Sequence, residues 1–206
     1  MRVAFVVAVV ALLALVLAPP REYVVRHPQV KPPVPAAGLK LKYKVDGVNR
    51  VAKLQSDLVI GPGTLETEID LITGDLTGDL TLPPSSGYFI VFGFMPNTAR
   101  VDLIPTSKVV GKIAAGQIKA NSQLHIKLSD VQVNGQPLDV GPDCKTSTPA
   151  SIDLEGPFDL AKIPMKATFT IPPFAGCRGA EKLDPLFSGL ISGPDNKLDM
   201  TLTAQF

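Results

Sequence analysis

The sequence predicts an all-β protein: an antiparallel β-sandwich, or a partly open barrel, of about ten strands with one disulfide. Three observations support this. Polar and apolar residues alternate along many short stretches. Turn residues separate these stretches at intervals of about 8–12 residues, as in sandwiches and barrels. Beyond residue 18, no window of about 12 residues or more has the helical period of 3.6.

The clearest element is a long amphipathic strand that begins at Gln117. Its apolar face carries Ile118, Ala120, Ser122, Leu124, Ile126 and Leu128. At about 3.3 Å per residue the strand spans roughly 36–40 Å, a length that requires several partner strands. Ser129-Asp130 interrupts the alternation and predicts a bulge. Asn134-Gly135 predicts a type I′ hairpin turn.

Shorter strands are predicted along the rest of the chain from residue 39. Alternation indicates strands at residues 39–46, 48–54, 65–71, 75–82, 99–104, 109–114, 152–154, 165–171 and 198–204. Pro83-Pro84 ends one of them, because proline cannot continue a hydrogen-bonded ladder. Residues 88–94 form a continuous apolar run, which is typical of a strand buried on both faces. A single turn of helix is expected around residues 183–190.

The beginning of the chain predicts export. Residues 3–18 are sixteen uncharged apolar residues, which match a signal peptide and are short for a membrane-spanning helix of about 20 residues. Pro19-Pro20 follows directly and disfavours cleavage, so residues 1–18 are interpreted as a signal peptide or an N-terminal membrane anchor. The protein is therefore expected to be secreted or extracytoplasmic, with a possible membrane tether at residues 3–18.

Residues 19–38 are predicted to form a spacer, and residues 39–206 a single domain. Six prolines in the spacer favour an extended, semi-rigid conformation. Acidic residues outnumber basic ones from residue 57 onward, which argues against a nucleic-acid partner. The basic residues gather before that point, where they either favour an anionic membrane surface or simply increase solubility.

The chain has two cysteines, Cys144 and Cys177. In an exported protein an even pair favours a disulfide, which for a loop of this length contributes about 3–4 kcal/mol on the chain-entropy model. The alternative is a metal site or a catalytic thiol pair. No histidine lies near either cysteine in the sequence, so this alternative has little support.

Several short stretches together resemble a known group of proteins. They are residues 58–63 (LVIGPG), 73–80 (TGDLTGDL), 93–96 (GFMP), 143–150 (DCKTSTPA), 173–177 (PFAGC) and 190–194 (LISGP). The set is similar to small exported all-β proteins of unknown function from high-GC Gram-positive bacteria. The resemblance implies export, an all-β domain and a disulfide between the two cysteine motifs, and it implies no activity. Arg178 and Asp195 depart from the group's pattern.

A search for catalytic signatures indicates a protein that is not an enzyme. The histidines are His27, in the spacer, and His125, on the polar face of the long strand. Ser122 lies three residues from His125 and so on the opposite face of a strand. Nucleophile-elbow, phosphate-binding and zinc-protease motifs are absent from the sequence. No cofactor is predicted.

One group of carboxylates could bind a cation. If Thr73-Gly74 is a two-residue turn, Glu68 lies opposite Asp79, and one face of the hairpin carries Glu66, Glu68, Asp70, Asp75 and Asp79. Like charges that face each other destabilise a sheet unless they are neutralised. Calcium would neutralise them. Solvation would also suffice, as would lysines of a neighbouring strand, either Lys40, Lys42 and Lys44 or Lys119 and Lys127.

A ligand cavity inside the domain is a further possibility. Small residues that could leave room are Gly78, Gly93, Ala99, Ala120 and Ala167, and phenylalanines that could line it are Phe89, Phe92, Phe94 and Phe169. A plainly packed core is the favoured alternative. The sequence thus favours a non-enzymatic protein of the bacterial envelope or extracellular space, with a structural role or an unknown protein or envelope partner. The second hypothesis is a carrier or sensor of a small apolar ligand such as a lipid.

Overall fold

The computed structural model describes residues 38–205. The predicted signal peptide or anchor (residues 1–18) lies outside the described residues, as does the spacer (residues 19–38) except for Gly38. The elements in chain order are β1 (Leu39–Val51), β2 (Ser56–Ile69), β3 (Asp75–Thr81), β4 (Ser85–Val91), β5 (Met95–Pro105), β6 (Val109–Ala114), β7 (Gln117–Val133), β8 (Gln136–Pro137), β9 (Lys145–Thr146), β10 (Ala150–Pro157), β11 (Lys162–Ile171), β12 (Phe174–Ala175), α2 (Asp184–Leu190) and β13 (Gly193–Ala204).

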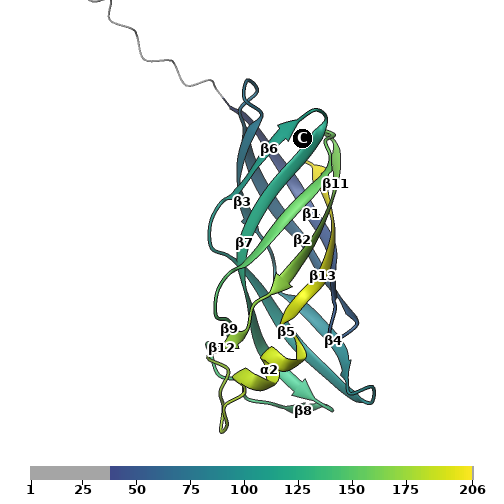
Figure 1. The fold of residues 1–206 in the computed structure, drawn as a ribbon, viewed down its shortest axis with the longest axis vertical. Helices are drawn as coiled ribbons and strands as arrows, with labels where there is room; N and C mark the ends of the chain where they lie inside the picture. Colours follow the sequence, from purple (N-terminus) through teal and green to yellow (C-terminus); the bar gives the residue numbers. More distant parts are fainter. Residues whose placement is uncertain (1–37, 206) are drawn as a thin grey trace, which may run out of the picture. The chain divides into compact units, whose positions relative to one another are not determined.

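Eight of these strands form a closed antiparallel barrel (Figure 1). Around the wall the order is β1, β2, β3, β6, β7, β10, β11 and β13, and β13 pairs with β1 to close it. The all-β class and the disulfide are confirmed, and the predicted sandwich is wrong. The alternative of a partly open barrel was right about the barrel, but the barrel is closed, and the described residues form thirteen strands where about ten were predicted. Alternation looks the same in a sandwich and in a barrel, so the sequence pattern could not distinguish them.

The predicted features of β7 are confirmed. The strand runs for 17 residues, and its apolar face is buried. Asp130 has a φ of 48°, and the register shifts opposite it, as expected for a bulge. Asn134 and Gly135 have φ angles of 48° and 76°, the positive values that a type I′ turn requires. The predicted helical turn is also present, as α2.

The predicted burial of residues 88–94 on both faces is wrong. The segment forms β4 and the tip of the β4–β5 hairpin, where Tyr88, Ile90, Phe92 and Phe94 are exposed. β3 and β4 follow one another along the wall, as do β5 and β6, so this hairpin extends two barrel strands toward the end that holds α2 (Figure 1). Because the residues on both faces of this strand are apolar, the sequence did not show that one face is exposed.

Candidate binding cavity

The barrel encloses a cavity of about 110 Å³. All eight barrel strands contribute to its wall, which is almost entirely apolar. One water molecule needs roughly 10–15 Å³, and an engineered apolar cavity of about 150 Å³ binds benzene. The interior of this barrel therefore has room for a small ligand.

Part of the expected lining is present. Ala120, Phe89 and Phe169 line the cavity, whereas Phe92 and Phe94 are exposed at the hairpin tip. An eight-stranded barrel has an interior that side chains can just fill, so small inward residues leave room for a ligand. Most of the lining residues belong to the packed hydrophobic core, which leaves about 110 Å³ of its interior unfilled.

Among the described residues that line this cavity, three have a buried polar atom without a hydrogen-bond partner. These atoms are the hydroxyl of Tyr43, Oδ1 of Asn49 and Oγ of Ser122, and all three side chains line the cavity. Their residues are 2%, 6% and 3% exposed. An unpaired buried polar group costs about 1–3 kcal/mol, and native proteins contain few of them. A partner from outside the chain would recover this free energy.

The three atoms lie on two opposite walls of the barrel. Tyr43 and Asn49 are both on β1, six residues and so roughly 20 Å apart along the strand. Ser122 is on β7, four strands away around the eight-stranded wall. Burial raises the pKa of the Tyr43 hydroxyl, and the negative charge of Asp159 raises it further. The hydroxyl is therefore protonated at neutral pH and can donate or accept a hydrogen bond.

The barrel wall has a seam between the first half of β2 and β4. Backbone pairing of β2 with β3 ends at Thr64 and Thr81, and no pairing of β2 with β4 occurs in the described residues. Two residues beyond that last pair stand Pro62 and Pro83, which have no N–H to donate. Side-chain packing replaces the ladder here, since Gly87 lies against Leu58.

The cavity reaches toward the surface at this seam. Asp57 of β2 and Tyr88 of β4 line the cavity, and both are more than half exposed. Asp57 is held by Arg50, whose guanidinium lies 3.2 Å from the carboxylate. Because only packing closes the seam, this part of the wall can open without breaking backbone hydrogen bonds.

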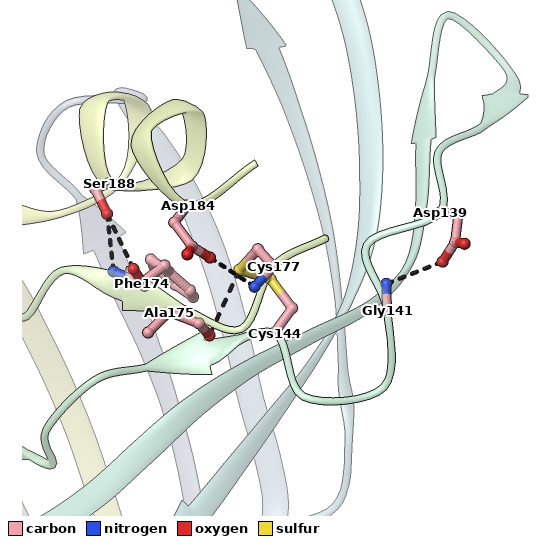
Figure 2. Close-up of a disulfide and its surroundings, with 8 residues drawn as sticks. All are labelled: Asp139, Gly141, Cys144, Phe174, Ala175, Cys177, Asp184 and Ser188. Carbon is pink, nitrogen blue, oxygen red and sulfur yellow. Dashed lines mark hydrogen bonds between the residues drawn. A yellow bond between two sulfur atoms is a disulfide. The ribbon is translucent and has the colours of Figure 1, made fainter. Parts of the chain in front are cut away.

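A disulfide-linked cap of β9, β12 and α2 covers one end of the barrel (Figure 1). Figure 2 shows the bond between Cys144 and Cys177, which confirms the predicted disulfide. The backbone N–H of Cys177 donates to the carboxylate of Asp184, at the start of α2. Ser188 Oγ accepts from the backbone N of Phe174 at 2.9 Å and donates to its carbonyl. Phe174 lines the cavity, so the cap forms its floor.

The disulfide indicates an oxidising, extracytoplasmic location. Reducing compartments keep cysteine thiols free, so a structural disulfide is typical of exported proteins. Within residues 38–205, no helix has the length and hydrophobicity that crossing a membrane requires.

The carboxylate group lies on one face, as predicted, but the predicted register is wrong. Glu66, not Glu68, lies opposite Asp79. The turn is wider than the two residues expected, because the carboxylate of Asp70 accepts hydrogen bonds from the backbone N–H groups of Ile72 and Thr73. These hydrogen bonds also lower the pKa of Asp70.

Lysines pair with three of the five carboxylates in this group. Three ion pairs are formed, Lys42 with Glu66 (3.1 Å), Lys108 with Asp79 (2.9 Å) and Lys112 with Asp75 (2.9 Å). Of these lysines, only Lys42 was among those expected, because β6 rather than β7 is the neighbour of β3. The hydrogen bond from Lys112 lowers the pKa of Asp75. Among the described residues, no cluster of three or more His, Cys, Asp or Glu side chains could hold a metal ion.

His125 and Ser122 form no catalytic pair. Ser122 faces the cavity, while Nδ1 of His125 lies 3.2 Å from the hydroxyl of Thr146. No hydrogen bond or ion pair joins His125 to a carboxylate anywhere in residues 38–205. The chemistry that this pair would need, a base in contact with both a nucleophile and an orienting acid, is not assembled here.

Comparisons with protein-family models, with curated proteins and with solved structures found no match. The resemblance to small exported proteins of high-GC Gram-positive bacteria therefore stays an expectation. Sequence reasoning did not identify Tyr43 and Asn49 as cavity residues. The available signal was a polar side chain at an inward position of an alternating strand, which for Tyr43 was masked by its aromatic character.

Proposed function

We propose that this protein binds a small, mainly apolar ligand inside its barrel and acts as a carrier or sensor of that ligand outside the cytoplasm. The observation that carries the proposal is the apolar cavity with its three unpaired polar atoms. The wall favours hydrocarbon. The hydroxyls of Tyr43 and Ser122 and the amide oxygen of Asn49 favour a ligand with a hydrogen-bonding group.

The volume limits the size of the ligand. A cavity of about 110 Å³ is smaller than the roughly 300–1,000 Å³ of sites for drug-sized molecules. It suits an aromatic ring or a short hydrocarbon segment, and a longer lipid would place only part of its chain inside. The seam between β2 and β4 is the route by which the ligand reaches the cavity.

A second role, structural or partner-binding, was the one that the sequence favoured. The exposed apolar surface of the β4–β5 hairpin is in its favour. Under either role the protein is not an enzyme, residues 1–18 direct export, and the domain works in the bacterial envelope or the extracellular space, secreted or tethered by residues 3–18. Native mass spectrometry of protein from its own host would reveal a co-purified ligand and the processed N-terminus.

Ligand binding can be tested by NMR titration with benzene and with phenol, which differ by one hydroxyl. Both are expected to shift the methyl signals of cavity residues. Phenol should bind about five- to tenfold more tightly, the effect of roughly one hydrogen bond. Ser122→Ala should reduce this preference. If neither compound shifts these signals, the proposal is wrong.

A pair of variants on β7 provides the control. Ala120→Leu places a larger side chain in the cavity, whereas Lys119→Leu adds the same side chain at the neighbouring, outward position. Binding of both probes should be lost in Ala120→Leu and kept in Lys119→Leu. Equal binding by the two variants would place the probes outside the barrel.

A further inference from the structure

The outer part of the β4–β5 hairpin is an apolar surface that ligand binding inside the barrel does not explain. We call this surface the hairpin tip and define it by Tyr88, Ile90, Phe92 and Phe94. The two phenylalanines are 70% and 74% exposed, Tyr88 is 59% exposed and Ile90 is 47% exposed. Large apolar side chains gathered at one place on a surface mark an interaction site.

The backbone of the tip adopts positive φ angles at two adjacent residues. β4 and β5 pair as far as Val91 and Met95, which leaves a loop of three residues. Phe92 has a φ of 55°, a conformation that aromatic residues rarely adopt, and Gly93 follows with a φ of 77°. Strain of this kind concentrates at functional sites.

The charge pattern indicates a lipid surface as the partner. No charged residue occurs between Asp79 and Arg100, a stretch that includes both strands of the hairpin up to Ala99. The opposite end of the barrel provides a contrast (Figure 1). There Ile72 is 83% exposed at the β2–β3 turn, but Asp70 and Asp75 flank it. Aromatic and aliphatic side chains enter the membrane interface readily, and carboxylates do not.

The hairpin tip adjoins the seam in the barrel wall. β4 forms one side of that seam, and Tyr88 belongs to the hairpin tip and also lines the cavity. Insertion of the tip into lipid would therefore bring the seam, and with it the opening of an apolar cavity, to the lipid surface. A ligand that is poorly soluble in water would then pass between lipid and barrel without crossing the solvent.

We propose that the β4–β5 hairpin docks the domain on a phospholipid bilayer by inserting Phe92 and Phe94. The attraction is hydrophobic, because the tip carries no charge. Binding is therefore expected to be similar for zwitterionic and anionic lipids and to change little with salt. Docking does not require a ligand in the cavity, so this proposal can be tested independently of the ligand binding proposed above.

The absence of tryptophan from the chain permits a direct test. In the full chain, Phe92→Trp places a single reporter at the hairpin tip, and Ile72→Trp places a matched reporter at the opposite end of the barrel. With phosphatidylcholine vesicles, the emission of the reporter at position 92 should shift to shorter wavelength and be quenched by brominated acyl chains. The reporter at position 72 should do neither, even if residues 3–18 also hold the chain on the vesicle.

A second variant measures the strength of docking. In a chain of residues 38–206, which contains all the strands of the described residues and the disulfide, Phe92→Ser with Phe94→Ser should weaken vesicle binding by about tenfold or more. Leu71→Ser with Ile72→Ser is the control and should leave binding unchanged.

Three results would overturn the proposal. The first is equal quenching of the two reporters, or of neither. The second is a shift of the position-92 emission without vesicles in a dimer, which would make the hairpin tip an interface between copies of this chain. The third is a shift of the position-92 emission without vesicles in a monomer, if removal of residues 1–37 abolishes that shift. This result would mean that residues 1–37 cover the hairpin tip.

Discussion

Substitution by alanine is expected to change the free energy of unfolding in opposite directions at two buried serines. Ser122 and Ser192 are 3% and 7% exposed, so both hydroxyls are removed from water. Ser122 Oγ has no hydrogen-bond partner, whereas Ser192 Oγ donates to the carbonyl oxygen of Pro172 at 2.7 Å. Replacing Ser122 by alanine removes an unpaired polar group, while replacing Ser192 leaves the Pro172 carbonyl without this donor.

The expected magnitudes follow from the cost of burying a polar group. An unpaired buried hydroxyl costs about 1–3 kcal/mol, so Ser122→Ala should raise the free energy of unfolding by about 1 kcal/mol after a small loss of packing. Ser192→Ala should lower it by about 1 kcal/mol, the net contribution of one hydrogen bond. The two variants should therefore differ by roughly 2 kcal/mol.

Urea denaturation of the ligand-free, oxidised protein, followed by circular dichroism, measures this difference. The slope with denaturant should be the same for both variants, because they expose the same area on unfolding. If Ser122→Ala is as destabilising as Ser192→Ala, the hydroxyl of Ser122 has a partner, and the argument from unpaired polar atoms fails. Stabilisation together with weaker phenol binding would instead identify a group retained for function at a cost in stability.

Three further predictions concern the disulfide, Tyr43 and the carboxylate group. Cys144→Ala with Cys177→Ala should lower the free energy of unfolding by about 3–4 kcal/mol from the loop-closure term, and an unchanged denaturation midpoint would show that the bond contributes nothing. The pKa of Tyr43 is raised in the folded state above its ordinary value of 10.0. Its contribution to the free energy of unfolding is therefore fully present below pH 10.0 and is lost as the pH rises through the folded-state pKa. Tyr43→Phe should lose less stability than the wild type above pH 10.0, and parallel curves for the two proteins would contradict this. A chelator should leave the melting temperature unchanged, because lysines pair with the carboxylates; a clear drop would reveal a bound cation.

The unpaired polar atoms also show how a binding site can be identified in a structure. Local rules of sequence and structure are usually violated where function requires it. Tyr43, Asn49 and Ser122 stand at inward positions, where an apolar residue would be more stable. Phe92 and Phe94 break the opposite rule, because they are exposed where a polar residue would be soluble. The three buried polar residues line the cavity, and the two exposed phenylalanines belong to the hairpin that adjoins the seam.

Local patterns in the sequence predicted most of the longer strands, but they missed residues 56–64 of β2 and the short strands β9 and β12. A period of two specifies a strand and separates its inward from its outward face, as in β7. The bulge at Ser129-Asp130 and the turn at Asn134-Gly135 depend on the conformational preferences of two adjacent residues, and so they could be predicted. The two cysteines sufficed for the disulfide, because a chain with a single pair of them leaves no choice of partner.

Tertiary pairing decided the rest. Whether the first and last strands meet is a long-range property, so only the structure shows that β13 pairs with β1 and closes a barrel. The register of β2 and β3 depends on the Asp70 carboxylate and its turn, which a period of two cannot show. The eight barrel strands together leave about 110 Å³ unfilled. This volume is the difference between the space that the barrel encloses and the volume of its inward side chains, so it cannot be calculated from any single segment of the sequence.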